Sequence, residues 1–353
     1  MNKKLLIAAV GAALVAGPMM AAQAAPTVYG HFHMSLDRYD NGKDATSSGS
    51  TERGVMNSNS SRFGIKGDED LGGGLKAIFQ VESGVFAADD GTSGFGNTLR
   101  NTYVGFTGSS WGTVKLGRHD TPVKDLGRAI DQFNEEVGDA RNITGHAGTF
   151  DQRINNMVRY DSTDFGGIRF ALQYSTPEVS TATRNVSGNV TFAQGPLYVG
   201  LGYETHAFNV SSKKDEKDIR LVGKYSMGDL VLSLLYETMD NLAGTSGADR
   251  KVLGLGGGFK MANNLLKLHY YKADKVDGQA TENGAKMWAL GVDHNFSKTT
   301  KVYANYAKVD NDSGTSAFNP SSSNGGHGTT NVPVAGANGA SPKVYSFGTI
   351  INF

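Results

Sequence analysis

The sequence predicts an all-β fold, a 16-stranded antiparallel transmembrane β-barrel, and two features support this prediction. From residue 25 onward, segments of roughly 8 to 11 alternating apolar and polar residues recur, separated alternately by short turns and longer polar loops. The final segment, KVYSFGTIINF (343–353), keeps this alternation to its last residue, whereas chain ends are usually polar and frayed. A closed barrel explains the ordered end, because the last strand must pair with the first to leave no edge in the bilayer.

The composition is compatible with such a barrel and excludes several other classes of protein. The 353 residues are 39% hydrophobic with a mean hydropathy of −0.33, which excludes a bundle of membrane helices. Barrel strands remain possible, because alternation hides their apolar side. Basic and acidic residues number 34 each, so no bulk charge indicates nucleic-acid binding. The absence of cysteine excludes disulfides, thiolate metal sites and cysteine nucleophiles.

The first 24 residues have the pattern of a cleaved secretory signal peptide. Lys3 and Lys4 precede an apolar run (5–16), and small residues surround Ala22-Gln23-Ala24. A membrane anchor is the alternative, but the run is shorter than the roughly 20 residues a bilayer requires, and Pro18 interrupts it. We therefore expect residues 1–24 to be removed and residues 25–353 to form one barrel domain.

Sixteen strands follow from the alternation. The first, VYGHFHMSLDR, places Val28, Phe32 and Leu36 on one face and His31 and His33 on the other. The strands are predicted to begin near Val28, Ser58, Leu75, Arg100, Gly112, Asn155, Ile168, Asn185, Tyr198, Asp218, Leu230, Arg250, Leu265, Lys286, Thr300 and Lys343. An even number suits a bacterial barrel with both ends on one side of the membrane.

A secreted β-sandwich or lectin-like protein would also combine alternating strands with a signal peptide. The polar faces of this chain, however, are rich in charged residues, as in LKAIFQVES (75–83) and IRFALQYS (168–175). Charged inner rows fit a water-filled lumen better than a packed sandwich core, and sixteen strands exceed the number in an ordinary sandwich.

The last strand and the long connections complete the predicted barrel. Tyr345, Ile351 and Phe353 are expected to face lipid where the barrel closes. The long connections are predicted at residues 40–56, 84–98, 118–152 and 312–342. The last of these is rich in glycine, serine and asparagine, which predicts a mobile extracellular loop.

Charged residues on the strands and in the 118–152 connection are the candidate functional residues. Arg62 and Lys66 share the inward face of SRFGIKG, and the connection is rich in carboxylates. If the connection folds into the barrel, it narrows the pore and sets a transverse field. Spacing alone leaves open whether these are instead solvated charges at the rim.

Four stretches carry a resemblance to a known family: SRFGIKGDEDLGGGLKAIFQ, LRNTYVGFTGSSWGTVKLGR, RYDSTDFGGIRFALQY and the terminal INF. Over essentially the whole mature chain, the sequence resembles the general-diffusion porins of Gram-negative outer membranes, especially the trimeric proteobacterial members. The resemblance implies an inward-folded third loop and a pore constriction. Its residues would be Arg62, Arg100 and Arg153 on strands, opposite Asp131 and Glu135 of the loop. The other lumen or loop candidates are His31, Lys66, Lys115, Arg118, Asp125, Glu136 and Asp139.

The chain also departs from the pattern of the enterobacterial members. His31 and Thr98 stand where those porins carry lumen lysines, and the loop tip reads NEEVGD instead of PEFGG. These departures predict a weaker fixed positive charge and a pH response through His31, and they leave the sign of ion selectivity open.

The resemblance implies passive diffusion of ions and small hydrophilic solutes, without cofactor or turnover. The expected partners are two further copies in a homotrimer, outer-membrane lipid and lipopolysaccharide, the barrel-assembly machinery and the solutes. No metal, nucleic acid or enzyme activity is predicted, because His31 and His33 lack a third ligand and no nucleophile motif occurs. A porin specific for sugars or small anions is the alternative, followed by an outer-membrane barrel enzyme or an adhesin.

Overall fold

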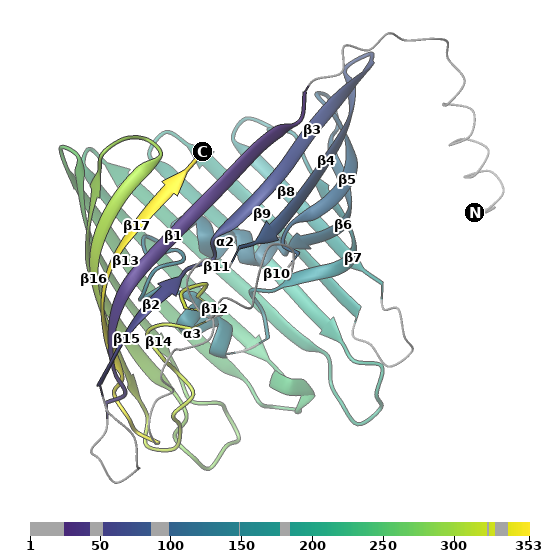
Figure 1. Cartoon of the computed structure of the whole chain (residues 1–353). Helices are drawn as coiled ribbons and strands as arrows, with labels where there is room; N and C mark the ends of the chain where they lie inside the picture. The colour runs from purple at the N-terminus through teal and green to yellow at the C-terminus, as the bar shows by residue number, and fades with distance from the viewer. Residues whose placement is uncertain are drawn as a thin grey trace.

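The computed structural model describes residues 25–42, 52–85, 99–147, 149–176, 184–322, 325–328 and 338–353. The predicted signal peptide (1–24) lies outside the described residues. Almost all the described elements are antiparallel strands of one closed sheet, shown in Figure 1.

The strands of the sheet fall into two runs in chain order. The first run is β1 (Thr27–Asp40), β2 (Glu52–Ser58), β3 (Arg62–Gly72), β4 (Leu75–Gly84), β5 (Thr102–Gly108), β6 (Gly112–Asp120), β7 (Arg153–Asp161), β8 (Ile168–Ser175) and β9 (Arg184–Gln194). The second run is β10 (Leu197–Ala207), β11 (Glu216–Met227), β12 (Leu230–Asp240), β13 (Arg250–Met261), β14 (Asn264–Ala273), β15 (Ala285–Asn295), β16 (Thr300–Asn311) and β17 (Lys343–Asn352).

These 17 segments make the predicted 16 strands of a barrel, because β2 and β3 are two halves of one strand. Both pair with β1, β2 along Met34–Asp40 and β3 along Thr27–His31. The break between them contains Ser60 in the left-handed region, at φ 52°. The largest displacement of a predicted strand start is at β2, which begins at Glu52 and not near Ser58. The starts of β5, β7 and β11 each differ from the predicted residue by two positions.

The alternation predicted for each strand is confirmed by the burial of its side chains. On β1, Val28 and Leu36 are exposed on the outer face, whereas His33 and Asp37 are buried inside. The same division recurs on the other strands, so the outside of the sheet is an apolar surface suited to lipid.

The ends of the sheet close as predicted. β1 pairs with β17 from His31 opposite Asn352 to Asp40 opposite Lys343. Gly30 and Phe353 exchange two backbone hydrogen bonds, of 3.0 and 3.1 Å. The closing strand exposes Tyr345, Ile351 and Phe353 on the outer face. The last residue is ordered because closure satisfies backbone groups that would otherwise face hydrocarbon.

The β6–β7 connection is not the unstructured loop that the sequence suggested. It contains helices α2 (Pro122–Ile130) and α3 (Arg141–Ala147), and a short 3₁₀ helix, η1 (Leu242–Gly244), lies elsewhere. Thr121 caps α2, its side chain accepting a hydrogen bond from the backbone of Lys124, and proline occupies the first turn. In the described part of the chain, no helix has the length and apolarity to cross a bilayer.

Apolar side chains of this connection pack on inward-facing residues of the second half of the barrel. Leu126, Ile143 and Phe150 belong to one buried cluster with wall residues of β11 to β16. The wall makes room for α2 on β10, where a Cβ on Gly200 would lie 2.5 Å from Leu126. Burial of these side chains stabilises the helices, which are too short to be stable alone.

Candidate functional site

Glu135 is the carboxylate that the structure brings to the predicted arginines. Nη1 of Arg62 lies 2.8 and 2.9 Å from the two carboxylate oxygens of Glu135. Arg100 lies 3.4 Å from Glu135 and donates a 2.9 Å hydrogen bond to Glu82. The two arginines therefore share two carboxylates, one from the β6–β7 connection and one from β4.

The environment of Glu135 keeps its carboxylate charged. Burial alone would raise its pKa, but Arg62, Arg100 and Arg128 outweigh that effect and hold the pKa well below its usual range. Glu135 also adopts φ +65°, a left-handed conformation uncommon for a residue with a Cβ. Such conformations persist where surrounding contacts hold them, and here the ion pairs do so.

Asp120, at the end of β6, is a second centre of opposite charge. Its carboxylate lies 3.1 Å from Lys124, 3.0 Å from Arg128 and 3.1 Å from Arg153. Arg128 also lies 3.9 Å from Glu135 and so joins the two centres. We refer to the connected group as the arginine cluster: Arg62, Arg100, Lys124, Arg128, Arg153, Glu82, Asp120 and Glu135.

The arginine cluster has more positive than negative charge, and its positive groups are the more accessible ones. Five cations surround three carboxylates, an excess of two. The four arginine side chains are 11% to 27% exposed, whereas Asp120, Glu82 and Glu135 are 1% to 10% exposed. Water next to the cluster therefore contacts mainly guanidinium groups, which bind anions by charge-assisted hydrogen bonds.

Asp131 does not face the arginines, contrary to what the resemblance implied. Its carboxylate accepts hydrogen bonds from the backbone nitrogens of Phe133 and Ala140, at 2.8 and 2.9 Å, and lies 3.4 Å from His269. It therefore holds together the turn between α2 and α3. Its position in the motif did not reveal these partners, because the path of this turn depends on contacts that are not local.

Asp139 and Glu136 also serve the connection rather than the arginine cluster. Asp139 accepts hydrogen bonds from Arg141 and from the backbone of Glu135. Glu136 is buried, forms an ion pair with Lys267 on β14 and lies 2.6 Å from Lys301 on β16. The connection thus has ion pairs with strands far apart around the sheet.

Close packing also places the β6–β7 connection against the wall of the barrel. Gly138 has φ +83°, and a Cβ there would lie 2.3 Å from that of Ala289 on β15. At the other end, Asp125 on α2 lies 2.8 Å from Arg159 on β7.

The remaining candidates have separate partners. His31 lies 3.3 Å from Glu135, beside the arginine cluster. Lys115 pairs with Asp161 at 2.9 Å, and Arg118 donates a hydrogen bond to the backbone of Leu99. Lys66 is exposed, and its ammonium lies 5.3 Å from the centre of the Tyr29 ring.

Residues 312–322 and 325–328, which belong to the connection predicted to be a mobile extracellular loop, pack against the β6–β7 connection and β1. Nε2 of His327 lies 2.9 Å from Asp37, and Asn142 donates a 2.9 Å hydrogen bond to the backbone of Pro320. Phe318 is buried in the apolar cluster with Leu126. The glycine-rich composition gave no indication of these contacts, which depend on single side chains.

Sequence reasoning missed Asp120, Lys124 and Arg128 as members of the cluster. Asp120 lies two residues after Arg118, and alternation would have placed both on one face. Lys124 and Arg128 lie four residues apart on α2, a spacing recognisable only once the helix is known.

A closed antiparallel barrel with an apolar exterior and a charged interior defines a class of protein: the transmembrane channels of outer membranes. A profile of the Gram-negative porin family matches residues 7–314. Outer membrane porin protein 32 of Delftia acidovorans is 32% identical, the match covering 88% of this chain and 90% of the relative. An outer membrane porin protein of Bordetella pertussis is 30% identical, over 87% of this chain and 94% of the relative.

Solved structures agree with this assignment. An anion-selective porin from Comamonas acidovorans has a TM-score of 0.76 at 25% identity, covering 93% of this chain and 99% of its own. OmpF of Salmonella typhi has a TM-score of 0.70 at 15% identity over 93% of this chain and 97% of its own, which shows the fold alone. The chain belongs to the Gram-negative porin family. It is an outer-membrane channel for passive diffusion of small solutes.

Proposed function

We propose that the β6–β7 connection (residues 121–152) is the constriction loop, and that solutes pass beside the arginine cluster with a preference for small anions. The observation that carries the preference is the excess of accessible guanidinium groups over carboxylates in the cluster. Among the proteins of similar structure, the porin from Comamonas acidovorans is named as anion-selective, which supports a preference for anions in this chain as well.

The mechanism follows from fixed charge in a narrow aqueous passage. Arg62, Arg100 and Arg153 replace part of the hydration shell of an anion as it passes, and Glu136 with its lysines holds the loop on the other side. Aligned charges also orient water, so an apolar solute that displaces this water leaves polar groups unpaired. Small hydrophilic anions therefore cross most readily, without cofactor or turnover.

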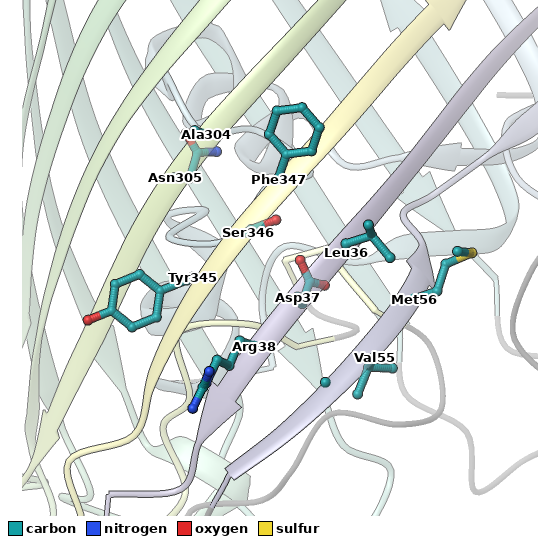
Figure 2. A pocket seen from close by; sticks show the side chains of 11 residues that line it. Leu36, Asp37, Arg38, Val55, Met56, Ala304, Asn305, Tyr345, Ser346 and Phe347 are labelled. Atoms are coloured by element: carbon teal, nitrogen blue, oxygen red, sulfur yellow. The ribbon is translucent and has the colours of Figure 1, made fainter.

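The wall of the barrel offers a surface for self-association. A groove of about 630 Å³ lies across β1, β2, β16 and β17, and Figure 2 shows the side chains that line it. Leu36, Met56, Tyr345 and Phe347 border it, and all four are more than half exposed. We assign this groove to contacts between copies in a homotrimer, because contiguous apolar surface with aromatic anchors is typical of protein interfaces.

The barrel-assembly machinery and the outer-membrane lipid are two further proposed partners. The closing strand, with Tyr345, Ile351 and Phe353 on its outer face, is the segment we assign to recognition by the barrel-assembly machinery. The apolar exterior faces lipid, including lipopolysaccharide.

Single-channel recording in a planar bilayer tests the proposed function. Purified folded protein should give uniform steps that close in thirds at high voltage, and a reversal potential in a salt gradient with the sign of an anion-selective pore. Steps with a cation-selective reversal potential would overturn the anion preference, and steps that never close in thirds would overturn the trimer.

A further inference from the structure

Two lysine–tyrosine pairs lie on the inward face of the wall, between the arginine cluster and the end of the barrel where the connections are short turns. The ammonium of Lys66 on β3 lies 5.3 Å from the centre of the Tyr29 ring on β1. The ammonium of Lys115 on β6 lies 5.1 Å from the centre of the Tyr103 ring on β5. Gln80 on β4 joins the pairs, because it lies opposite Lys66 on one side and Tyr103 on the other. We call these five residues the lysine–tyrosine patch.

The lysine–tyrosine patch adjoins the arginine cluster directly. Lys66 shares the inward face of β3 with Arg62, about 13 Å further along the strand. The hydroxyl of Tyr29 donates a 2.9 Å hydrogen bond to Glu82, which also contacts Arg62 and Arg100. An anion that passes the arginine cluster along this wall therefore reaches the patch next.

Both tyrosine rings of the patch are held in place on the wall. Tyr29 is fixed through Glu82, and a Cβ on Gly64 would lie 2.3 Å from its ring, so the missing side chain there lets the ring lie over β3. The hydroxyl of Tyr103 donates a 3.4 Å hydrogen bond to the side-chain oxygen of Gln80. Both tyrosines remain partly exposed. Rings that are already ordered bind a planar solute with little further loss of side-chain entropy.

The two pairs differ in how far other residues occupy them. Lys115 forms a 2.9 Å ion pair with Asp161, and the ring of His119 lies beside that of Tyr103, with centroids 5.6 Å apart. Lys66 is exposed, and in the part of the chain that the structure describes no carboxylate lies within ion-pair distance of its ammonium. The pair that contains Lys66 is therefore the one open to a solute.

The charged groups that contact the lysine–tyrosine patch give it a positive balance. Two carboxylates touch its members, Glu82 and Asp161. Both are also bound by arginines, Glu82 by Arg100 at 2.9 Å and Asp161 by Arg159 at 2.8 Å. With the two lysines of the patch, four cations meet two carboxylates. The immediate surroundings of the patch therefore attract an anion.

The acidic residues between the patch and the short turn are engaged with groups other than Lys66. Asp68 lies 2.8 Å from the ammonium of Lys76. Asp70 accepts a 2.8 Å hydrogen bond from the backbone of Gly72. The charge of Lys66 is therefore left to the lumen.

An ammonium above a tyrosine ring favours one chemical class of solute. The ring face attracts the ammonium, so a neutral sugar must displace the lysine before it can stack there. An anion pairs with the ammonium instead and brings its own body to the ring. A flat aromatic body gains stacking energy beyond the burial of apolar area, which an aliphatic body of the same charge does not. The pair therefore fits an anion that carries its charge next to an aromatic ring.

We propose that Lys66 and Tyr29 form a binding site for small aromatic carboxylates of the benzoate class. The ammonium of Lys66 pairs with the carboxylate, and the ring of Tyr29 stacks on the ring of the solute. This inference rests on the proposed function and deepens it, because it names a class of anion that the channel takes up beside the arginine cluster. An exposed lysine contributes little affinity, so the solute is also released, as conduction requires.

The test compares how benzoate and cyclohexanecarboxylate reduce the chloride current through the folded mature protein in a planar bilayer. These monoanions have the same charge and similar size, but only benzoate is flat and aromatic. In the parent, the half-blocking concentration of benzoate should be about fivefold lower than that of cyclohexanecarboxylate. Tyr29→Phe keeps the ring and should keep this ratio, whereas Tyr29→Leu should reduce the ratio to about one. Heat-modifiability shows that each variant is folded.

The charge of the site is tested separately from its ring. Lys66→Gln should weaken the block by both anions about threefold and leave the ratio between them unchanged, because it removes an exposed ion pair but no stacking. The matched control, Lys260→Gln, removes an exposed lysine near the short-turn end of β13 and should be blocked like the parent.

Two results would exclude the site. Equal block of the parent by the two anions would show that no ring stacks, and a benzoate block unchanged in both Lys66→Gln and Tyr29→Leu would place the binding elsewhere. The reversal potential of the parent in a chloride gradient separates this inference from the proposed function. An anion-selective parent that fails these tests refutes the aromatic site alone, whereas a cation-selective parent refutes the anion preference on which the site rests.

Discussion

Arg62 and Glu135 are 73 residues apart in the sequence, yet the guanidinium of one lies 2.8 Å from the carboxylate of the other. The pair joins β3 to the β6–β7 connection. Both side chains are largely buried, so removal of one partner leaves the other charge poorly solvated. The pair thus positions an arginine and anchors the proposed constriction loop at once.

Loss of an arginine should shift selectivity toward cations. In Arg62→Ala and Arg100→Ala, one positive charge leaves the proposed pore and the passage widens. A unit charge about 5 Å from the ion path changes the permeability to a monovalent ion by about fourfold in a water-like dielectric, in opposite directions for anions and cations. Reversal potentials and conductance should both change, whereas Lys298→Ala, in an exposed turn, should match the parent. Unchanged reversal potentials in both arginine variants would remove these residues from the constriction.

Loss of the opposing carboxylate should have the reverse effect on selectivity. Glu135→Gln removes one of three carboxylates from the arginine cluster, so anion preference should rise by a similar factor. The same change weakens an anchor of the connection, so open-channel noise should increase. Glu282→Gln is the matched control, because this carboxylate pairs with Lys275 away from the cluster. A Glu135→Gln channel with lower anion preference would contradict the assignment.

Selectivity should depend on pH through Lys124 on α2. Burial lowers the pKa of this lysine to about 8, despite its contact with Asp120. As pH rises from about 7 to about 9, Lys124 loses its proton and the cluster loses one positive charge, so anion preference should fall with a midpoint near 8. Reversal potentials across this range measure the change. The Lys124→Gln channel should have a lower anion preference at neutral pH, and this preference should not change with pH. An equally steep change in this variant would assign the titration to another group.

The closing residue should contribute to barrel stability. The ring of Phe353 stacks on Phe32 with centroids 5.7 Å apart and covers Gly30. Phe353→Ala loses this packing, worth about 1 kcal/mol beyond apolar area, and should unfold at a lower temperature in a heat-modifiability assay. Phe296→Ala, also exposed and aromatic but in a turn, should unfold near the parent temperature. Equal effects of both variants would mean that closure does not depend on this ring.

The groove in Figure 2 predicts where charge should disrupt assembly. Leu36→Arg places a cation in the middle of the proposed interface between copies, so the trimer should dissociate in mild detergent. Leu290→Arg places the same charge on the exposed outer face of β15, away from the groove, and should leave assembly unchanged. Mass measurement in detergent distinguishes the outcomes. A stable Leu36→Arg trimer would show that the interface between copies does not include this groove.

Much of the fold was predictable because its signal is local. Alternation with a period of two placed Leu36 outside and His33 inside, and it located every strand start except that of β2 to within two residues. The break between β2 and β3 was not predicted, because residues 40–56 were assigned to a long connection; the outward positions also change phase across the break, from Met56 on β2 to Ile65 on β3. Neither was α2, whose apolar residues are stabilised by the wall of the barrel.

In the candidate site, too, residues on strands were predictable from the sequence, whereas the partners of residues in the connection were not. Arg62 and Arg100 were found from their strand motifs, and the structure brings both to Glu135. The structure pairs Asp131 with backbone amides and His269, and it brings Asp120, which the sequence analysis did not name, to Arg153. Which carboxylate meets which arginine depends on the path of a connection through space.

Most of the strands, their inward and outward faces and the closure of the barrel follow from local patterns in the sequence. A bilayer requires paired backbone groups and an apolar exterior. The alternation of apolar and polar residues along each strand meets both requirements locally. The path of the β6–β7 connection, the carboxylates that reach the arginines and the contacts of Glu136 with β14 and β16 depend on the three-dimensional arrangement of the whole barrel. Ion pairs act over a few ångströms in space and are indifferent to separation along the chain, so no local pattern specifies them.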